Sequence, residues 1–138
     1  MFKTNISRFN NTYGEFIASQ NWNIYGTTTY KSPTSSTSNR RLFERLFQSE
    51  KSIDKMFFVS EPFISSYHVH CHFLISCNDD IKTLNKLTSK FSRYGRHQIN
   101  LISDVDYFKN DKNEFSVCYY VTKSLSKGVD YDFFIKYT

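Results

Sequence analysis

Two hydrophobic periodicities alternate along the chain, and they predict its elements. Short stretches rich in Thr, Val, Ile, Tyr and Phe, the residues that favour strands, predict strands at 23–30, 55–63, 67–76, 98–105 and 131–137. Stretches in which apolar residues recur every three to four positions predict helices at 39–50, 78–91 and 113–127, with a short helix near 12–20. The Ser-rich segment 32–39 is typical of a loop. Gly128 stands where a helix over 113–127 would end.

The order of these elements predicts an α+β fold. Elements that follow one another as strand, helix, strand, strand, helix, strand, helix, strand form an antiparallel sheet with helices packed on it. The strands at 55–63 and 67–76 are too close in sequence for a helical crossover, so they should pair as a hairpin. With 138 residues, the chain is expected to form a single domain over residues 1–138.

Composition narrows the class of protein. Lys and Arg exceed Asp and Glu by 18 to 13, a net charge of +5 that is compatible with nucleic acid but does not require it. The three cysteines are an odd number, which predicts a reduced, intracellular protein. No apolar run approaches the ~20 residues that span a bilayer, and the sequence contains no P-loop motif. We therefore expect neither a membrane nor a nucleotide cofactor as a partner.

The stretch YHVHCHFLIS (67–76) holds three of the four histidines of the chain at alternate positions. Side chains in a strand alternate between faces, so His68, His70 and His72 should share one face. The residues of the other face are uniformly apolar and should face the core: Val69, Cys71, Phe73, Ile75 and Cys77. This separation argues against a zinc site with both cysteine and histidine ligands.

Adjacent histidines on such a face can hold a metal ion. Residues i and i+2 of a strand lie about 6.5–7 Å apart, a gap that two imidazoles close around an ion with bonds of about 2.1 Å. Glu61 ends the strand that should pair with this one, so its carboxylate is a candidate further ligand. Two imidazoles and a carboxylate suit Mg²⁺, Mn²⁺ or Zn²⁺ acting on a phosphate. The alternative interpretation is a solvated sheet face with surface histidines.

The predicted helix at 113–127 carries further candidate chemistry. At 100° per residue, three residues form a stripe that should be buried: Val117, Val121 and Leu125. Tyr120, Lys123 and Lys127 lie together on the flank of this stripe. A tyrosine hydroxyl can act as a nucleophile, and ammonium groups beside it can hold a phosphate. Taken alone, the same pattern is typical of a surface tyrosine beside solvated lysines.

In order along the chain, these motifs resemble those of the HUH endonucleases, and among them the rolling-circle replication initiators (Rep proteins). The first motif of that family resembles YGTTTY (25–30). The second, a histidine–hydrophobic–histidine strand, resembles HCHFLI (70–75), and the third, Tyr-x-x-Lys on a helix, resembles YVTK (120–123). The resemblance covers residues 22–127, most of the chain.

The resemblance implies a five-stranded antiparallel sheet of the ferredoxin- or RRM-like type. It implies a divalent ion, Mn²⁺ or Mg²⁺, held by His70, His72 and a nearby acid or amide, with Glu61 as the candidate acid. It also implies that Tyr120 attacks a DNA phosphodiester and leaves a 5′-phosphotyrosyl bond and a free 3′-OH. Lys123 would neutralise charge in this step, and Lys127 is a candidate DNA contact. The expected partners are single-stranded origin DNA and host replication proteins, inside the host of a phage, plasmid or archaeal virus.

Several assignments stay open. The triplet HVH would make His68 and His70 the ligand pair, and Tyr119 is a competing nucleophile. Ser124 stands where some phage initiators carry a second tyrosine, so a single-tyrosine enzyme is expected. The alternative functions are a non-catalytic RRM-like domain that binds single-stranded nucleic acid and a single-tyrosine HUH transposase.

Overall fold

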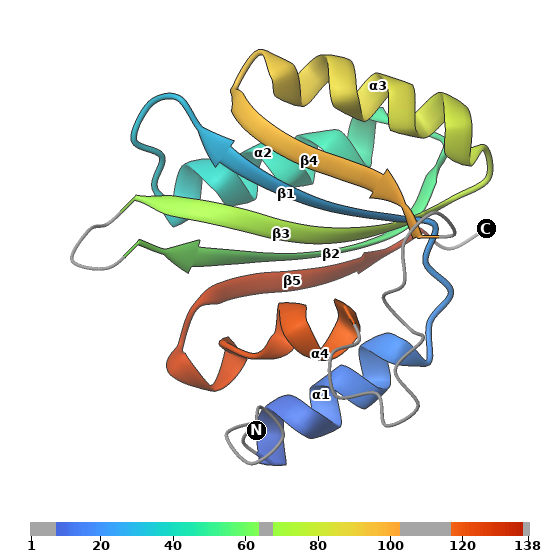
Figure 1. Cartoon of the computed structure of the whole chain (residues 1–138). Coiled ribbons are helices and arrows are strands. Elements are labelled where there is room, and N and C mark those ends of the chain that lie inside the picture. The colour runs from blue at the N-terminus through green and yellow to red at the C-terminus, as the bar shows by residue number, and fades with distance from the viewer. Residues whose placement is uncertain (1–7, 64–67, 103–116, 137–138) are drawn as a thin grey trace.

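A five-stranded antiparallel sheet forms the centre of the protein (Figure 1). The computed structural model describes residues 8–63, 68–102 and 117–136. The strands are β1 (Ile24–Tyr30), β2 (Ile53–Pro62), β3 (Val69–Cys77), β4 (Gly95–Leu101) and β5 (Asp130–Ile135), in the spatial order β4-β1-β3-β2-β5. The helices are α1 (Arg8–Ala18), α2 (Ser36–Ser49), α3 (Asp80–Ser92), α4 (Val117–Thr122) and the short 3₁₀ helix η3 (Leu125–Lys127).

The α+β fold with an antiparallel sheet, predicted from the sequence, is confirmed. From β1 to β4 the chain follows the split β-α-β arrangement, in which β1 and β3 are the central strands. Each of them is antiparallel to both of its neighbours, and β2 and β3 form the expected hairpin. The strand β5 extends the sheet beyond β2.

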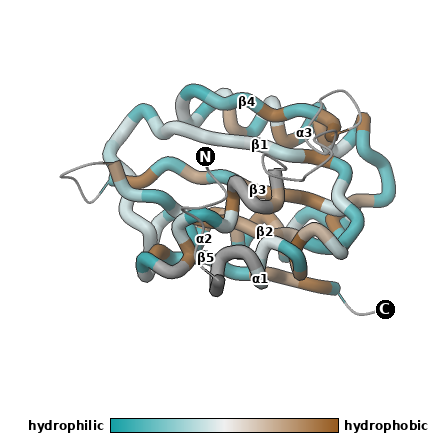
Figure 2. Tube along the Cα trace, turned by 60° about the horizontal axis from the view of Figure 1, so that its bottom comes forward, coloured by the Kyte–Doolittle hydropathy of each residue, from teal (hydrophilic) through white to brown (hydrophobic). Residues whose placement is uncertain are grey.

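Hydrophobic clusters cover both faces of the sheet. One lies between the sheet and α2 and α3 and includes Phe43, Phe73 and Phe91. The other lies between the sheet and α1 and α4, which Figure 1 shows below the sheet, and includes Leu74 and Val121. In Figure 2 the hydrophobic residues concentrate along β2 and β3, in the middle of the sheet. The sequence predicted the first cluster, which contains Cys71 and Cys77; the second arises because α1 and α4 place their apolar sides on the histidine face.

Element boundaries differ from the predictions where side chains act on the backbone. Helix α2 begins inside the segment predicted as a loop, because the hydroxyl of Ser35 accepts a hydrogen bond from the Ser38 N–H at 3.2 Å and caps the helix. The helix predicted at 113–127 is interrupted: α4 ends at Thr122, a turn follows, and η3 continues to Lys127. Residues 113–116 lie outside the described part of the chain. Gly128 ends η3 in the left-handed conformation (φ 78°), as expected.

The glycine of YGTTTY has a packing role. Gly26 pairs with Phe73 across β1 and β3. A Cβ atom at position 26 would lie 2.2 Å from Cζ of the Phe73 ring, far inside van der Waals contact. Because Phe73 is fully buried between Phe43 and Phe91, its ring has little room to move away.

We therefore expect Gly26→Ala to lower the free energy of unfolding by about 1–3 kcal/mol, the usual cost of overpacking a core. Urea denaturation followed by circular dichroism measures this loss. Adding Phe73→Leu to the Gly26→Ala variant should recover part of it, because the shorter side chain leaves space for the methyl group. A Gly26→Ala variant as stable as the wild type would contradict this account of the motif.

Candidate metal centre

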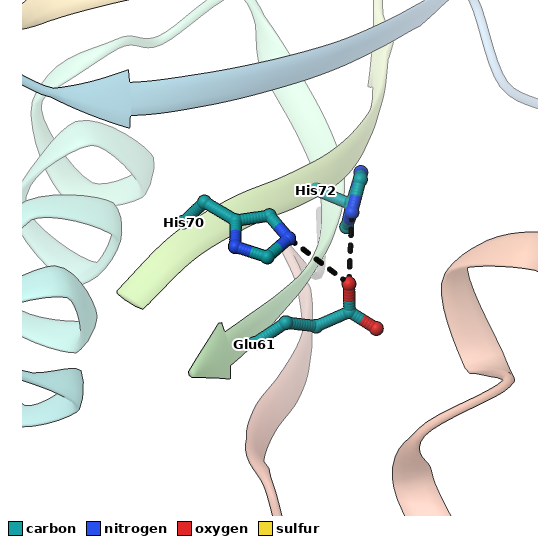
Figure 3. Close-up of side chains that lie close together, drawn as sticks. All are labelled: Glu61, His70 and His72. Atoms are coloured by element: carbon teal, nitrogen blue, oxygen red, sulfur yellow. Dashed lines mark hydrogen bonds and ion pairs between the residues drawn. The ribbon is translucent and has the colours of Figure 1, made fainter. Parts of the chain in front are cut away.

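Three side chains on the histidine face converge at one point (Figure 3). Nε2 of His70 lies 3.2 Å from Oε1 of Glu61, and Nε2 of His72 lies 3.0 Å from the same oxygen. One ligand atom from each residue lies within 4.8 Å of the other two, so the group can hold a metal ion. Within the described ranges, no other group of three or more His, Cys, Asp or Glu side chains meets this condition.

The sheet register produces this convergence. Glu61 lies opposite His70 in the β2–β3 hairpin, so their side chains share a face, and His72 is the next residue of β3 on that face. The expectation that adjacent histidines and Glu61 come together, drawn from strand periodicity alone, agrees with this geometry. The same periodicity directs Cys71 into the cluster on the opposite face.

The group is buried on one side and accessible on the other. Glu61 and His72 are buried, with exposed fractions of 7 % and 5 %. The His70 side chain keeps 27 % of its surface exposed. Among the described residues, the group is therefore most accessible at His70.

The second oxygen of Glu61 is held by the segment that follows α4. Nζ of Lys123 lies 2.9 Å from Oε2 and 3.1 Å from Oε1, and the Ser124 hydroxyl donates a hydrogen bond of 2.6 Å to Oε2. Both residues lie in the turn that interrupts the predicted helix. This interruption is what directs two consecutive side chains to one carboxylate.

The surroundings set the charge of the group. Burial by itself raises the pKa of the Glu61 carboxyl, but hydrogen bonds from His70, His72, Ser124 and Lys123 outweigh it and hold the pKa well below its usual range. Burial lowers the pKa of His72, although Glu61 opposes this change. At neutral pH the carboxylate is thus anionic and the His72 imidazole neutral, the protonation states that metal ligands need.

Tyr25 adds a contact behind His72. Its hydroxyl lies 3.3 Å from Nδ1 of His72, and the two rings are parallel within 3°. When Nε2 of a histidine binds a metal ion, Nδ1 carries the proton and needs an acceptor. The Tyr25 oxygen is in position to accept a hydrogen bond from Nδ1–H and so to hold the orientation of the ring.

The other candidates from the sequence differ in where the structure places them. Lys123 joins the Glu61 group, whereas His68, half-buried just before β3, is not part of it. Tyr119 and Tyr120 lie in α4, but the placement of their side chains lies outside what the structure describes, as does that of Val117. Lys127 is exposed on η3. The buried stripe of this segment contains Val121 and Leu125, as predicted, together with Cys118.

Sequence reasoning did not assign a role to Tyr25 or Ser124. Tyr25 has the right strand parity to share the histidine face, but only the β1–β3 register shows how near it comes to His72. Ser124 carries no signal in the sequence, because its contact depends on where α4 ends.

Comparisons with models of known protein families, with curated proteins and with solved structures find no match for this chain. None of the described helices is long and apolar enough to cross a membrane.

If the group binds an ion as its geometry allows, His70→Ala, His72→Ala and Glu61→Gln should each weaken Mn²⁺ binding measured by isothermal titration calorimetry. We expect the loss to exceed the ~10–100-fold typical of removing a residue that only orients a ligand. His68→Ala is the matched control and should bind Mn²⁺ as the wild type does. A loss at His68 with none at His72 would move the ligand pair to His68 and His70.

The contacts on Oε2 predict effects of opposite sign. Ser124→Ala removes a hydrogen bond that orients the carboxylate, so Mn²⁺ affinity should fall by about tenfold. Lys123→Met removes a cation that competes for the same carboxylate, so Mn²⁺ affinity should rise. The same calorimetric titration measures both. If the affinity for Mn²⁺ falls in both variants, Lys123 orients Glu61 rather than competing with the ion.

Proposed function

We propose that this protein is a metal-dependent endonuclease that nicks and rejoins single-stranded DNA through a 5′-phosphotyrosyl intermediate, and that it initiates rolling-circle replication. The observation that carries the proposal is the ion pair between Lys123 and Glu61. It joins the lysine of the Tyr-x-x-Lys motif to the carboxylate of the histidine group, although the two motifs are far apart in the sequence.

The donor set supports a catalytic ion. Glu61, His70 and His72 would hold a Mn²⁺ or Mg²⁺ ion, which in such sites polarises a phosphate oxygen. Three protein ligands leave coordination positions free for a substrate, and the exposed edge of His70 leaves a route to them. The low pKa of Glu61 keeps the carboxylate available at neutral pH.

The helix backbone supports a nucleophile at position 120. Tyr120 lies in the last turn of α4, and Lys123 is the first residue after that helix ends at Thr122, so the two residues are close along the backbone. Attack by the tyrosine oxygen forms a bond between that oxygen and the phosphorus atom, and the bond between phosphorus and the 3′ oxygen breaks. The phosphate stays on the 5′ end of the cut strand. The phenolic proton passes to solvent, and the departing 3′ oxygen takes one up. Lys123 stabilises the negative charge that develops at the phosphate.

The proposed reaction needs no nucleotide cofactor, because the energy of the broken phosphodiester bond is kept in the bond to tyrosine. The phosphotyrosyl ester retains the energy of the phosphodiester, so the free 3′-OH can reverse the attack and rejoin the strand. This reversal is the step that a replication initiator uses to close the displaced strand into a circle.

Tyr120→Phe removes only the nucleophilic oxygen. With labelled single-stranded DNA and Mn²⁺, the wild type should form an adduct that survives a denaturing gel, whereas Tyr120→Phe should form none and still bind DNA. Lys123→Ala should keep adduct formation at a rate lowered by about 10²–10³-fold. EDTA should abolish adduct formation by the wild type.

Mass spectrometry of the trapped adduct identifies the nucleophile. Tyr119→Phe is the matched control and should react as the wild type does. An adduct on Tyr119 would change the residue and keep the mechanism. Binding of DNA without any adduct, with or without Mn²⁺, would exclude the mechanism and favour a non-catalytic binding domain.

A further inference from the structure

A small pocket lies beside the metal group at one end of the sheet. It has a volume of about 200 Å³. Its lining comes from the last residue of β1, Tyr30, from residues 31–34 of the connection to α2, and from Phe63, His68 and Val69 at the base of the β2–β3 hairpin. Figure 1 shows the β1–α2 connection and the hairpin at the same end of the sheet. The pocket therefore lies where β3 begins at Val69, one residue before His70 of the metal group.

Backbone hydrogen bonds hold the two walls of the pocket in place. The Val69 N–H donates to the Thr34 carbonyl at 2.9 Å, which ties the hairpin to the β1–α2 connection. The Phe63 N–H donates to the His68 carbonyl at 2.9 Å and closes the base of the hairpin. On the other wall, the Tyr30 hydroxyl donates to the buried Asn39 of α2. The pocket is thus formed before any ligand arrives.

Phe63 gives this pocket an exposed aromatic ring. It keeps 42 % of its surface exposed. Its ring centroid lies 4.9 Å from that of His70, with a tilt of 42°. A flat group that stacks on the outer side of Phe63 would therefore lie one ring away from a candidate metal ligand.

The remaining lining of the pocket suits a nucleotide. Lys31 and Ser32 are exposed on its rim and offer a cation and a hydroxyl group. Proteins that bind single strands combine aromatic rings, on which bases stack, with cations that follow the phosphates. At about 200 Å³ the pocket is smaller than the ~300–1,000 Å³ of pockets for drug-sized ligands. A single base fits this size, and a base pair does not.

We propose that this pocket binds one unpaired nucleobase of the DNA strand, next to the phosphate at the metal group, by stacking on Phe63. The inference rests on the proposed function and deepens it, because it explains how the site selects single-stranded DNA. A base in a duplex is stacked and paired and cannot enter, so only an unpaired strand places its phosphate beside His70 with a base in the pocket.

Phe63 variants test the proposal by DNA affinity without metal. Fluorescence anisotropy with a labelled single-stranded oligonucleotide of mixed sequence, in EDTA, should show binding weakened about 5- to 150-fold in Phe63→Ala, the range for losing one stacked base. Phe63→Leu should be weakened similarly, because it covers His70 without a stacking surface, and Phe63→Tyr should bind as the wild type does. Phe16→Ala is the matched control: Phe16 lies on α1 with 46 % exposure, and its removal should leave DNA affinity unchanged.

An abasic nucleotide moved along the oligonucleotide locates the base. When the missing base is the one next to the nicked phosphate, the oligonucleotide should bind the wild type more weakly. Its binding to Phe63→Ala should be the same as that of the intact oligonucleotide. Because this comparison includes the wild type, a Phe63→Ala variant that fails to fold does not remove the test: equal affinity of the wild type for every abasic oligonucleotide would overturn the proposal.

The outcomes separate this proposal from the proposed function. If the wild type nicks DNA normally and Phe63→Ala binds DNA as the wild type does, the proposal that the pocket binds a base is overturned and the proposed nuclease function stands. If an abasic nucleotide weakens binding at one position but no covalent adduct forms, the pocket binds a base and the proposed nuclease function is wrong. Loss of Mn²⁺ binding in Phe63→Ala, with no abasic effect in the wild type, would mean that Phe63 only supports His70 and would overturn the proposal.

Discussion

The buried carboxylate of Glu61 is the interaction on which this structure depends. A buried anion without partners is strongly unfavourable, and Glu61 satisfies its two oxygens with imidazoles from β3 on one side and with Lys123 and Ser124 on the other. Removing one partner from such a buried group is typically far more destabilising than its net contribution suggests. The carboxylate therefore fixes the position of β3 and of the segment after α4 relative to each other.

The same carboxylate contacts both the histidines of the metal group and Lys123. Lys123 and a metal ion both need the negative charge of Glu61, and a divalent ion in the group would share that charge with the ammonium group. Binding of an ion would thus weaken the hold of Glu61 on Lys123 and free the lysine to interact with a phosphate. In this arrangement the lysine becomes available when the ion is present, which is when the proposed reaction needs it.

Local patterns predicted much of the fold and of the site, and tertiary geometry decided the rest. Alternation along β3 separates His70 and His72 from Cys71, and hairpin pairing adds Glu61; both follow from strand geometry alone. The start of α2 at Ser36 did not follow, because a single hydrogen bond to the Ser35 hydroxyl caps the helix there. The turn after Thr122 did not follow either, and with it the contact of Ser124 with Glu61. The cover over the histidine face was also not predicted, since it depends on how α1 and α4 dock on β2 and β3.

The position of the metal group on the sheet explains its uneven burial. Over β2 and the inner part of β3, the histidine face is covered by α1 and α4, and His72 is buried there. Over β1 and β4, the same face carries Thr27, Thr29, Arg96 and Gln98, which line an open hollow of about 360 Å³ with His97. Register places Thr27 opposite His72 and Thr29 opposite His70, so the group lies on the border between the two halves. The covered half supplies the low dielectric that strengthens the charge interactions of Glu61, and the other half is open in the part of the chain that the structure describes. A site at the centre of either half would have only one of these properties.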